Sequence, residues 1–157
     1  MYRELVTMNK PLIFSVLLFA SRSGFPAESL TVMGSFDDVR STETGHCYGK
    51  SVSLWKFKTG DIVGLLDVHE GLCGDPACSV LTGAVNDHGL SFKTLSPIYS
   101  QSYTFDGKIE GQNLVGKLND IDISLKSNNY FARDGDLKSW CETWSKVPRC
   151  SGVKEYC

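Results

Sequence analysis

The chain of 157 residues is mildly acidic, with a hydrophobic fraction of 41% and a formal net charge of −2. Lys and Arg form no block along it, so nucleic acid and anionic membrane are not expected as partners. A chain of this length forms one domain that buries about two-thirds of its unfolded surface, and it needs no metal or cofactor to supply a core.

The N-terminus has the layout of a secretory signal peptide. A charged start, MYRELVTMNK, is followed by the apolar run PLIFSVLLFA and the small-residue stretch SRSGFPAES. The apolar run is about half of the roughly twenty residues that a membrane span requires. We expect cleavage after Ser23 or Ala27, which leaves a periplasmic or secreted domain over 28–157 without membrane insertion. Beyond Ala27 there are 13 Lys and Arg against 17 Asp and Glu, a net charge of −4.

The cysteines predict three disulfides, because all six lie in the mature segment of an exported chain. Cys73 and Cys78 flank Gly-Asp-Pro-Ala, in which Asp-Pro suits the start of a type I turn. A four-residue connection brings flanking cysteines opposite one another, so we expect a Cys73–Cys78 bond that fixes a hairpin tip. The other bonds join the remaining four: Cys141 to Cys150 or Cys157, and the last cysteine to Cys47. That last bond closes a loop of about a hundred residues and contributes most of the disulfide stability.

Short strands account for most of the chain. Between Cys47 and Lys126, apolar, β-branched and aromatic runs alternate with turn residues, and no helical period persists. Turns at 59–61, 86–89 and 111–113 are short enough for hairpins, and SLTVMGSF supplies an earlier strand. The result is an all-β, mainly antiparallel meander of about eight strands that closes into a small barrel or sandwich. Gly64 and Gly116 recur in two similar hairpins and indicate bending or close backbone approach.

Strand alternation assigns side chains to faces. Along DIVGLLDVHEG, Ile62 and Leu66 share one face, whereas Leu65, Asp67 and His69 share the other, which becomes polar towards its end. In YSQSYTF the same rule places the aromatic residues at 99, 103 and 105 on one face. Such a face indicates either half-buried tyrosines with wet hydroxyls or the wall of a binding site.

The period changes to that of a helix after residue 129. Apolar residues then recur at i, i+3, i+4, i+7 and i+10: Leu137, Trp140, Cys141, Trp144 and Val147. Asp134 or Asp136 caps the start, and Pro148 ends the helix. We therefore expect one amphipathic helix at about 135–147, packed on the sheet.

A meander of about eight strands followed by one helix, over Leu30 to Val147, resembles lipocalin-type small barrels. The resemblance implies the same overall layout. It extends no further, because the Gly-x-Trp start of that family is absent and Trp55 lies in mid-strand without a glycine two residues before it. No ligand and no residue role follow from it.

Catalytic motifs are weak throughout the sequence. The histidines at 46, 69 and 88 lack the helical i, i+4 pair or the Cys-x-x-Cys spacing of a zinc site. There is no Gly-x-Ser-x-Gly motif, and no cysteine is expected to remain free beside a histidine. The carboxylates at 67 and 70 face opposite sides of one strand and cannot act together. We therefore expect a binding protein rather than an enzyme.

The leading hypothesis is an exported protein-binding module, an inhibitor or immunity-type protein that presents Asp75 and Pro76 on a rigid loop to a protein partner in the cell envelope or outside. Its acidity favours a basic target such as a cell-wall-degrading enzyme. One alternative is small-molecule binding inside the barrel, and a second is a zinc-dependent enzyme with converging histidines. The expected binding residues are Asp75, Pro76, His69, Glu70, Trp55, Tyr99 and Tyr103.

Overall fold

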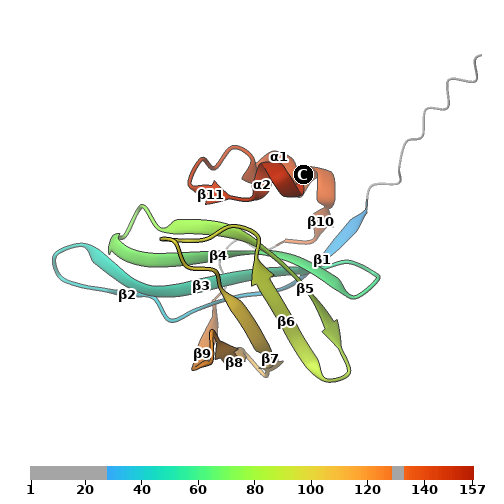
Figure 1. The fold of residues 1–157 in the computed structure, drawn as a ribbon, viewed down its shortest axis with the longest axis horizontal. Coiled ribbons are helices and arrows are strands. Elements are labelled where there is room, and N and C mark those ends of the chain that lie inside the picture. Colours follow the sequence, from blue (N-terminus) through green and yellow to red (C-terminus); the bar gives the residue numbers. More distant parts are fainter. Residues whose placement is uncertain (1–27, 129–132) are drawn as a thin grey trace, which may run out of the picture.

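The computed structural model describes residues 28–128 and 133–157, so the predicted signal peptide lies outside the described residues. The elements in this part of the chain appear in Figure 1. Their bounds are β1 Ser29–Asp37, β2 Arg40–Ser41, β3 His46–Lys56, β4 Asp61–Leu72, β5 Ala77–Asn86, β6 Gly89–Thr94, β7 Thr104–Glu110, β8 Asn113–Leu118, β9 Ile121–Asn128, β10 Gly135–Asp136, α1 Leu137–Trp144, β11 Cys150–Ser151 and α2 Val153–Tyr156.

Eight of these strands form a closed antiparallel barrel. Strands β3 to β9 pair with their neighbours in chain order, and β1 closes the barrel by pairing with both β9 and β3. The eight barrel strands are the eight that alternation and turn spacing predict, so the all-β barrel prediction is confirmed. The short strands β2, β10 and β11 lie outside this barrel order and pair with β3, β1 and β5, respectively.

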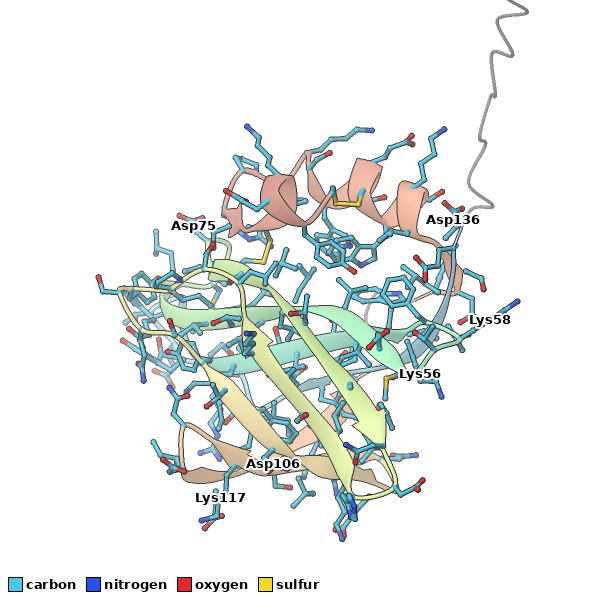
Figure 2. The ribbon with its side chains drawn as sticks, turned by 45° about the vertical axis from the view of Figure 1, so that its right-hand side comes forward. Lys56, Lys58, Asp75, Asp106, Lys117 and Asp136 are labelled. Atoms are coloured by element: carbon cyan, nitrogen blue, oxygen red, sulfur yellow. A yellow bond between two sulfur atoms is a disulfide. The ribbon has the colours of Figure 1, made fainter. Side chains whose placement is uncertain are left out.

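The meander gives the barrel two ends with different connections. The β3–β4, β5–β6 and β7–β8 turns lie at one end, and the β4–β5, β6–β7 and β8–β9 connections lie at the other. We call the second the disulfide end, because two disulfides attach there to the start of β3, the end of β4 and the start of β5. In Figure 2, Asp75 and Lys58 mark the disulfide end and the opposite end.

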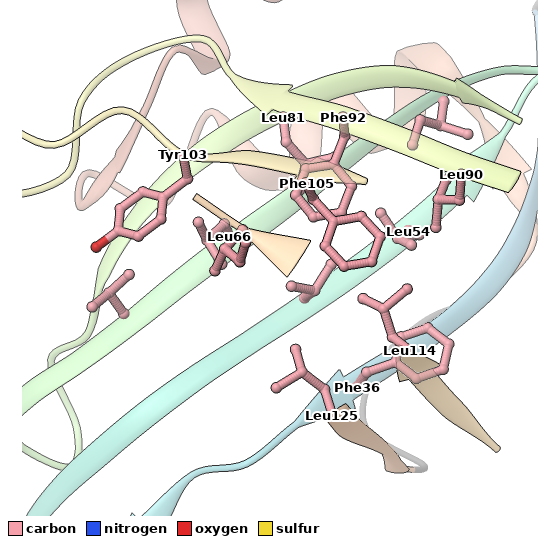
Figure 3. Packing of buried hydrophobic residues seen from close by; sticks show 14 of the residues in the cluster. Phe36, Leu54, Leu66, Leu81, Leu90, Phe92, Tyr103, Phe105, Leu114 and Leu125 are labelled. Atoms are coloured by element: carbon pink, nitrogen blue, oxygen red, sulfur yellow. The ribbon is translucent and has the colours of Figure 1, made fainter. Parts of the chain in front are cut away.

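The barrel interior is filled by one cluster of fifteen buried side chains drawn from all eight strands and from the β6–β7 connection. Figure 3 shows members of this cluster from β1, β3, β4, β5, β6, β7, β8 and β9 packed against each other. Phe92 and Phe105 stack with ring centroids 4.8 Å apart, and Leu54 and Leu114 have no exposed surface. Burying a side chain of this kind stabilises the fold by about 1.5–3 kcal/mol.

A second apolar cluster lies outside the barrel and holds the C-terminal segment on it. The outward side chains Trp55, Val63 and Leu65 pack with Trp140 and Val153 from the two helices. In Figure 1 the helices α1 and α2 cover the β4 side of the barrel, away from β7 to β9. The alternation predicted along β4 is confirmed, because Ile62 and Leu66 belong to the inner cluster instead.

The C-terminal helix starts where the sequence predicts and ends earlier. Asp136 is the N-cap, and its carboxylate accepts a hydrogen bond of 3.0 Å from the Ser139 backbone N–H. The helix ends at Trp144 instead of Val147. Pro148 disfavours helical backbone at the residue before it, so the last predicted turn opens and the chain runs to Cys150 beside β5.

The structure contains three disulfides, Cys47–Cys73, Cys78–Cys150 and Cys141–Cys157, and no cysteine is free. The number of bonds is confirmed, as is the option of Cys141 with Cys157. Three disulfides indicate an oxidising environment, such as the outside of a cell or the periplasm. In the described residues no helix is long and apolar enough to cross a membrane.

The predicted Cys73–Cys78 bond is wrong because the β4–β5 hairpin is not symmetric about its turn. Asp67 of β4 lies opposite Cys78, so β4 runs five residues past that point before Cys73 follows. Cys73 reaches the start of β3 instead and bonds Cys47, with the Cα atoms 4.6 Å apart. The bond expected between Cys47 and the C-terminal segment is also absent, and Cys78–Cys150 takes that role over 72 residues.

Candidate functional site

The predicted binding residues separate into two places. Glu70, Tyr99 and Tyr103 lie at the disulfide end of the barrel. The charges of Glu70 and Tyr99 contribute to raising the pKa of the Tyr103 phenol. Three others line a groove on the outer face of β1, β3 and β4, which we call the outer groove: Trp55, His69 and Pro76. Asp75 is exposed in the turn before β5.

Exposed apolar side chains gather at the disulfide end. Among the described residues, five large hydrophobic side chains are exposed: Tyr48, Leu72, Leu95, Tyr99 and Ile121. Each belongs to the start of β3, the end of β4, the β6–β7 connection or the start of β9, which all lie at this end. An exposed apolar surface on a monomer is a candidate interaction site, whereas apolar residues that are exposed singly are ordinary, so the concentration of all five at one end is the relevant feature. We call these five residues the apolar end patch.

Two members of this patch stand on a ribbon that extends beyond the barrel wall. The β3–β4 pairing continues to Leu72, whereas β5 begins pairing only at Val68. Tyr48, opposite Glu70, and Leu72 share the inward-facing side of this ribbon. Their exposed fractions are 53% and 68%. The Cys47–Cys73 bond on the other side of the ribbon holds its end together.

The Tyr99 side chain is presented by a tight turn, not by a strand. Ile98 and Gln101 exchange two backbone hydrogen bonds of 2.9 Å, with Tyr99 and Ser100 between them at φ of 48° and 67°. Two positive φ angles in a two-residue loop define a type I′ turn, which prefers Asn-Gly. The single strand face predicted for residues 99 to 105 is therefore wrong, because the turn breaks the alternation. Tyr99 is 58% exposed, whereas Tyr103 is buried.

Tyr103 and Phe105 belong to the inner cluster and do not wall a cavity. Tyr103 also exchanges backbone and side-chain hydrogen bonds with Thr94, at 2.9 and 3.0 Å. Burial, with smaller contributions from the charges of Glu70 and Tyr99, raises the pKa of the Tyr103 phenol. Trp55 lies on the outer side of the barrel, so the residues expected to surround an interior ligand do not meet.

The β4–β5 loop is anchored at both ends, although not by the predicted bond. Cys73 is tied to β3 and Cys78 to β11. The Cys73 backbone N–H donates a hydrogen bond of 3.2 Å to the Gly45 carbonyl. Asp75 is exposed as expected, but Pro76 is buried and lines the outer groove, so its predicted exposure is wrong.

The outer groove has a volume of about 580 Å³ and a polar floor. Ser51 lies between Asp37 of β1 and Asp67 of β4 in the strand register. In the next row the Ser35 and Ser53 hydroxyls lie 2.9 Å apart. The remaining lining includes apolar side chains, Leu65 and Trp144 among them, and Arg149 from the C-terminal segment.

Two polar atoms of this floor are buried without a hydrogen-bond partner among the described residues, Asp67 Oδ1 and His69 Nδ1. The other carboxylate oxygen, Asp67 Oδ2, accepts a hydrogen bond of 3.4 Å from the Ser51 hydroxyl. Burial raises the pKa of Asp67 above its ordinary value of 3.8, against the opposing charges of Arg149 and His69. Asp67 is thus a partly buried acid with one buried carboxylate oxygen, and its charged form is only partly compensated.

We expect Asp67→Asn to change how stability depends on pH. With a raised pKa, the folded state binds more protons than the unfolded state in the range above pH 3.8, so the free energy of unfolding falls as pH rises through that range. The Asn variant lacks this fall. At neutral pH we expect its free energy of unfolding to be at least that of the wild type, and at most about 1 kcal/mol higher. Urea unfolding at several pH values measures the difference. Parallel pH profiles for the two proteins would contradict the burial of an ionisable Asp67.

The histidines do not converge, so the expectation attached to a zinc enzyme is wrong. His46 and His69 lie towards the disulfide end, and His88 lies in the β5–β6 turn at the opposite end. Asp67, Cys78 and Cys150 form the one group of three potential ligands found among the described residues. Both of its sulfur atoms belong to a disulfide and offer no thiolate.

Sequence reasoning missed Tyr48 and Leu72 of the apolar end patch and Asp67, Trp144 and Arg149 of the outer groove. Alternation did place Asp67 and His69 on one polar face. Arg149 of the C-terminal segment acts on Asp67 and lines the same groove, and the sequence did not predict that this segment lies there.

Comparisons with protein-family models, curated proteins and solved structures give no significant match for this chain. The fold and the two candidate surfaces therefore carry the functional argument.

Proposed function

We propose that this chain is an exported, non-catalytic binding module that inhibits or neutralises a basic protein, as an inhibitor or immunity-type protein does. The observation that carries the proposal is the gathering of the exposed large hydrophobic side chains, as described above, at one end of the barrel. Protein interfaces combine such an apolar centre with a polar rim, and tyrosine is enriched among the residues that contribute most to binding.

Rigidity of this end supports a protein partner. The Cys47–Cys73 bond closes the ribbon end, and the Tyr99-Ser100 turn is fixed by two hydrogen bonds. Side chains held in place lose little entropy on docking, so more of the contact energy appears as affinity. A Tyr in a left-handed turn position, where Asn or Gly costs less, is the kind of local strain that accompanies function.

The acidic residues of the connections at this end favour a basic target. The three connections at residues 73–76, 95–103 and 119–120 contain two Asp and no Lys or Arg. Glu70 adds a further negative charge on the ribbon. Complementary charge accelerates association and selects among partners. A small basic cell-wall-degrading enzyme, a muramidase such as lysozyme, is a target of this kind.

The proposal is tested by inhibition of lysozyme by the purified 28–157 chain. We expect inhibition by the wild type and a loss of at least about tenfold in inhibitory potency for Leu72→Ala, because truncating a central apolar contact costs more than about 1 kcal/mol. The readout is the rate at which lysozyme clears a suspension of cell walls.

His88→Ala is the matched control, since His88 is an exposed ring in a hairpin turn at the opposite end. Its potency should equal that of the wild type. A wild type without effect on lysozyme would remove this target, and equal potency of the Leu72 and His88 variants would remove the apolar end patch as the contact.

The alternative of a ligand inside the barrel has less support, because the inner cluster occupies the interior with its own side chains. A ligand site on the outer face of the barrel is a separate matter and does not compete with the proposed protein contact.

A further inference from the structure

The outer groove contains buried polar atoms that the described protein does not satisfy. Asp67 and His69 have neighbouring outward positions on β4, and Asp67 Oδ1 and His69 Nδ1 have no hydrogen-bond partner within residues 28–128 and 133–157. Leaving one such group unsatisfied costs about 1–3 kcal/mol, and folded proteins retain few of them. Both residues line a groove large enough for a small ligand, so the groove is the place where a partner for these atoms would bind.

The floor of the groove offers both donors and acceptors in adjacent rows. Ser51 lies opposite Asp67 and Ser53 lies opposite Leu65 in the next row, while His69 lies on the other side of Asp67 along β4, and all of these residues line the groove. A hydroxyl group on a ligand donates to a carboxylate and accepts from a serine or arginine at the same time. A ligand with several hydroxyl groups therefore matches this floor better than one with donors alone.

The charges of the lining argue for a neutral ligand. Asp37 and Asp67 repel an anion from the floor. Arg149 disfavours a cation, since its charge acts on Asp67 and would oppose a second positive group there. A neutral ligand avoids both costs, and its hydroxyl groups can still donate a charge-assisted hydrogen bond to the carboxylate and accept one from the guanidinium.

The sides of the groove supply apolar contacts. Trp144 and Trp55, with ring centroids 6.4 Å apart, and Leu65 lie along it. Sites of about 300–1,000 Å³ that combine aromatic walls with a few polar groups are typical of small-ligand binding, and this groove has about 580 Å³. We propose that the outer groove binds a neutral polyhydroxylated ligand of saccharide type between the Asp67–His69 floor and the Trp144 wall.

Intrinsic fluorescence measures this binding directly, because all three tryptophans of the chain belong to the outer apolar cluster. The 28–157 chain is titrated with maltotriose, cellotriose and N,N′,N″-triacetylchitotriose as neutral probes. Tyramine and trigalacturonate are the cationic and anionic probes. We expect a saturable fluorescence change with at least one neutral trisaccharide and none with the two charged probes.

Asp67→Ala is expected to weaken that binding at least about tenfold, since it removes a hydrogen bond to a charged group. Arg149→Ala should weaken it as well, and this exposed side chain can be removed without disturbing the fold. Asp106→Ala, at an exposed carboxylate on β7, is the matched control and should leave binding unchanged. Binding of tyramine or trigalacturonate alone, binding of none of the five probes, or equal affinity in the Asp67, Arg149 and Asp106 variants would overturn the proposal.

This inference is independent of the proposed protein contact. Leu72→Ala changes the apolar end patch and leaves the groove lining intact, so it should retain saccharide binding. Failure of one proposal is therefore distinguishable from failure of the other.

Discussion

Replacing Cys78 and Cys150 together with alanine is expected to lower the free energy of unfolding by about 4 kcal/mol. The bond joins residues 72 positions apart. In the chain-entropy model, closing a loop of this length restricts the unfolded chain and stabilises the fold by that amount. It also holds β11 parallel to β5, where the Ser151 hydroxyl donates a hydrogen bond of 3.1 Å to the Cys78 carbonyl. Urea unfolding, followed by tryptophan fluorescence, measures the loss.

The matched variant replaces Cys141 and Cys157, whose separation is only 16 residues. The same account gives about 3 kcal/mol for that bond, so the first double variant should be the less stable of the two. The first variant should also lose the outer groove, because removal of the Cys78–Cys150 bond frees the segment that carries Trp144 and Arg149. If replacing Cys78 and Cys150 lowered the free energy of unfolding by less than about 1 kcal/mol, this would contradict the claim that their disulfide stabilises the fold more than the other bonds do.

Replacing Gly64 with alanine is expected to cost about 3 kcal/mol. A Cβ at this position would collide with the Ser53 backbone carbonyl on β3 and approach the Leu81 side chain to 2.9 Å. The neighbouring strand cannot yield without loss of its register, and overpacking of this kind costs about 1–3 kcal/mol or more. Thermal unfolding of the variant measures the effect.

Gly71→Ala on the same strand is the control, because a Cβ there meets no atom within 4 Å. We expect little change in stability from it. A Gly64 variant as stable as the Gly71 variant would show that β3 and β4 adjust, and that close backbone approach does not explain the glycine in mid-strand.

Local pattern accounts for most of the fold. The eight barrel strands, the faces of β4 and the Asp136 cap depend on residues close in sequence, and alternation or capping chemistry reveals them. The recurrence of Gly64 and Gly116 predicts bending or close backbone approach, and the structure shows close approach at both, since a Cβ at either position would collide with backbone on a neighbouring strand.

Long-range register accounts for what the sequence did not predict. The pairing of Asp67 with Cys78 displaces Cys73 from its expected partner, and no local signal encodes that offset. The type I′ turn at Tyr99 was missed because Tyr-Ser is an unusual choice where Asn-Gly is preferred. Asp67 Oδ1 is unsatisfied among the described residues, beside Cys78 and Cys150, which come together from distant parts of the chain.

The function is less accessible from sequence than the fold for the same reason. Tyr48 and Leu72 look like ordinary strand residues until the extent of the β3–β4 ribbon beyond β5 is known. The neighbouring hairpin turn at Asn119 and Asp120 has the same positive φ angles with residues that tolerate them. Tyr99 is therefore an unusual residue at a left-handed position where Asn, Asp or Gly would be favoured.

The most direct test of the protein-binding account replaces Tyr99 with Asn and Ser100 with Gly together. The preferred type I′ residues should raise the free energy of unfolding by about 1 kcal/mol, because they relieve two left-handed positions. The same change removes an exposed aromatic contact, so the account predicts a dissociation constant for lysozyme at least about tenfold higher, measured by calorimetry. A variant that gains stability and binds lysozyme as tightly as the wild type would contradict the claim that the apolar end patch is the protein-binding surface.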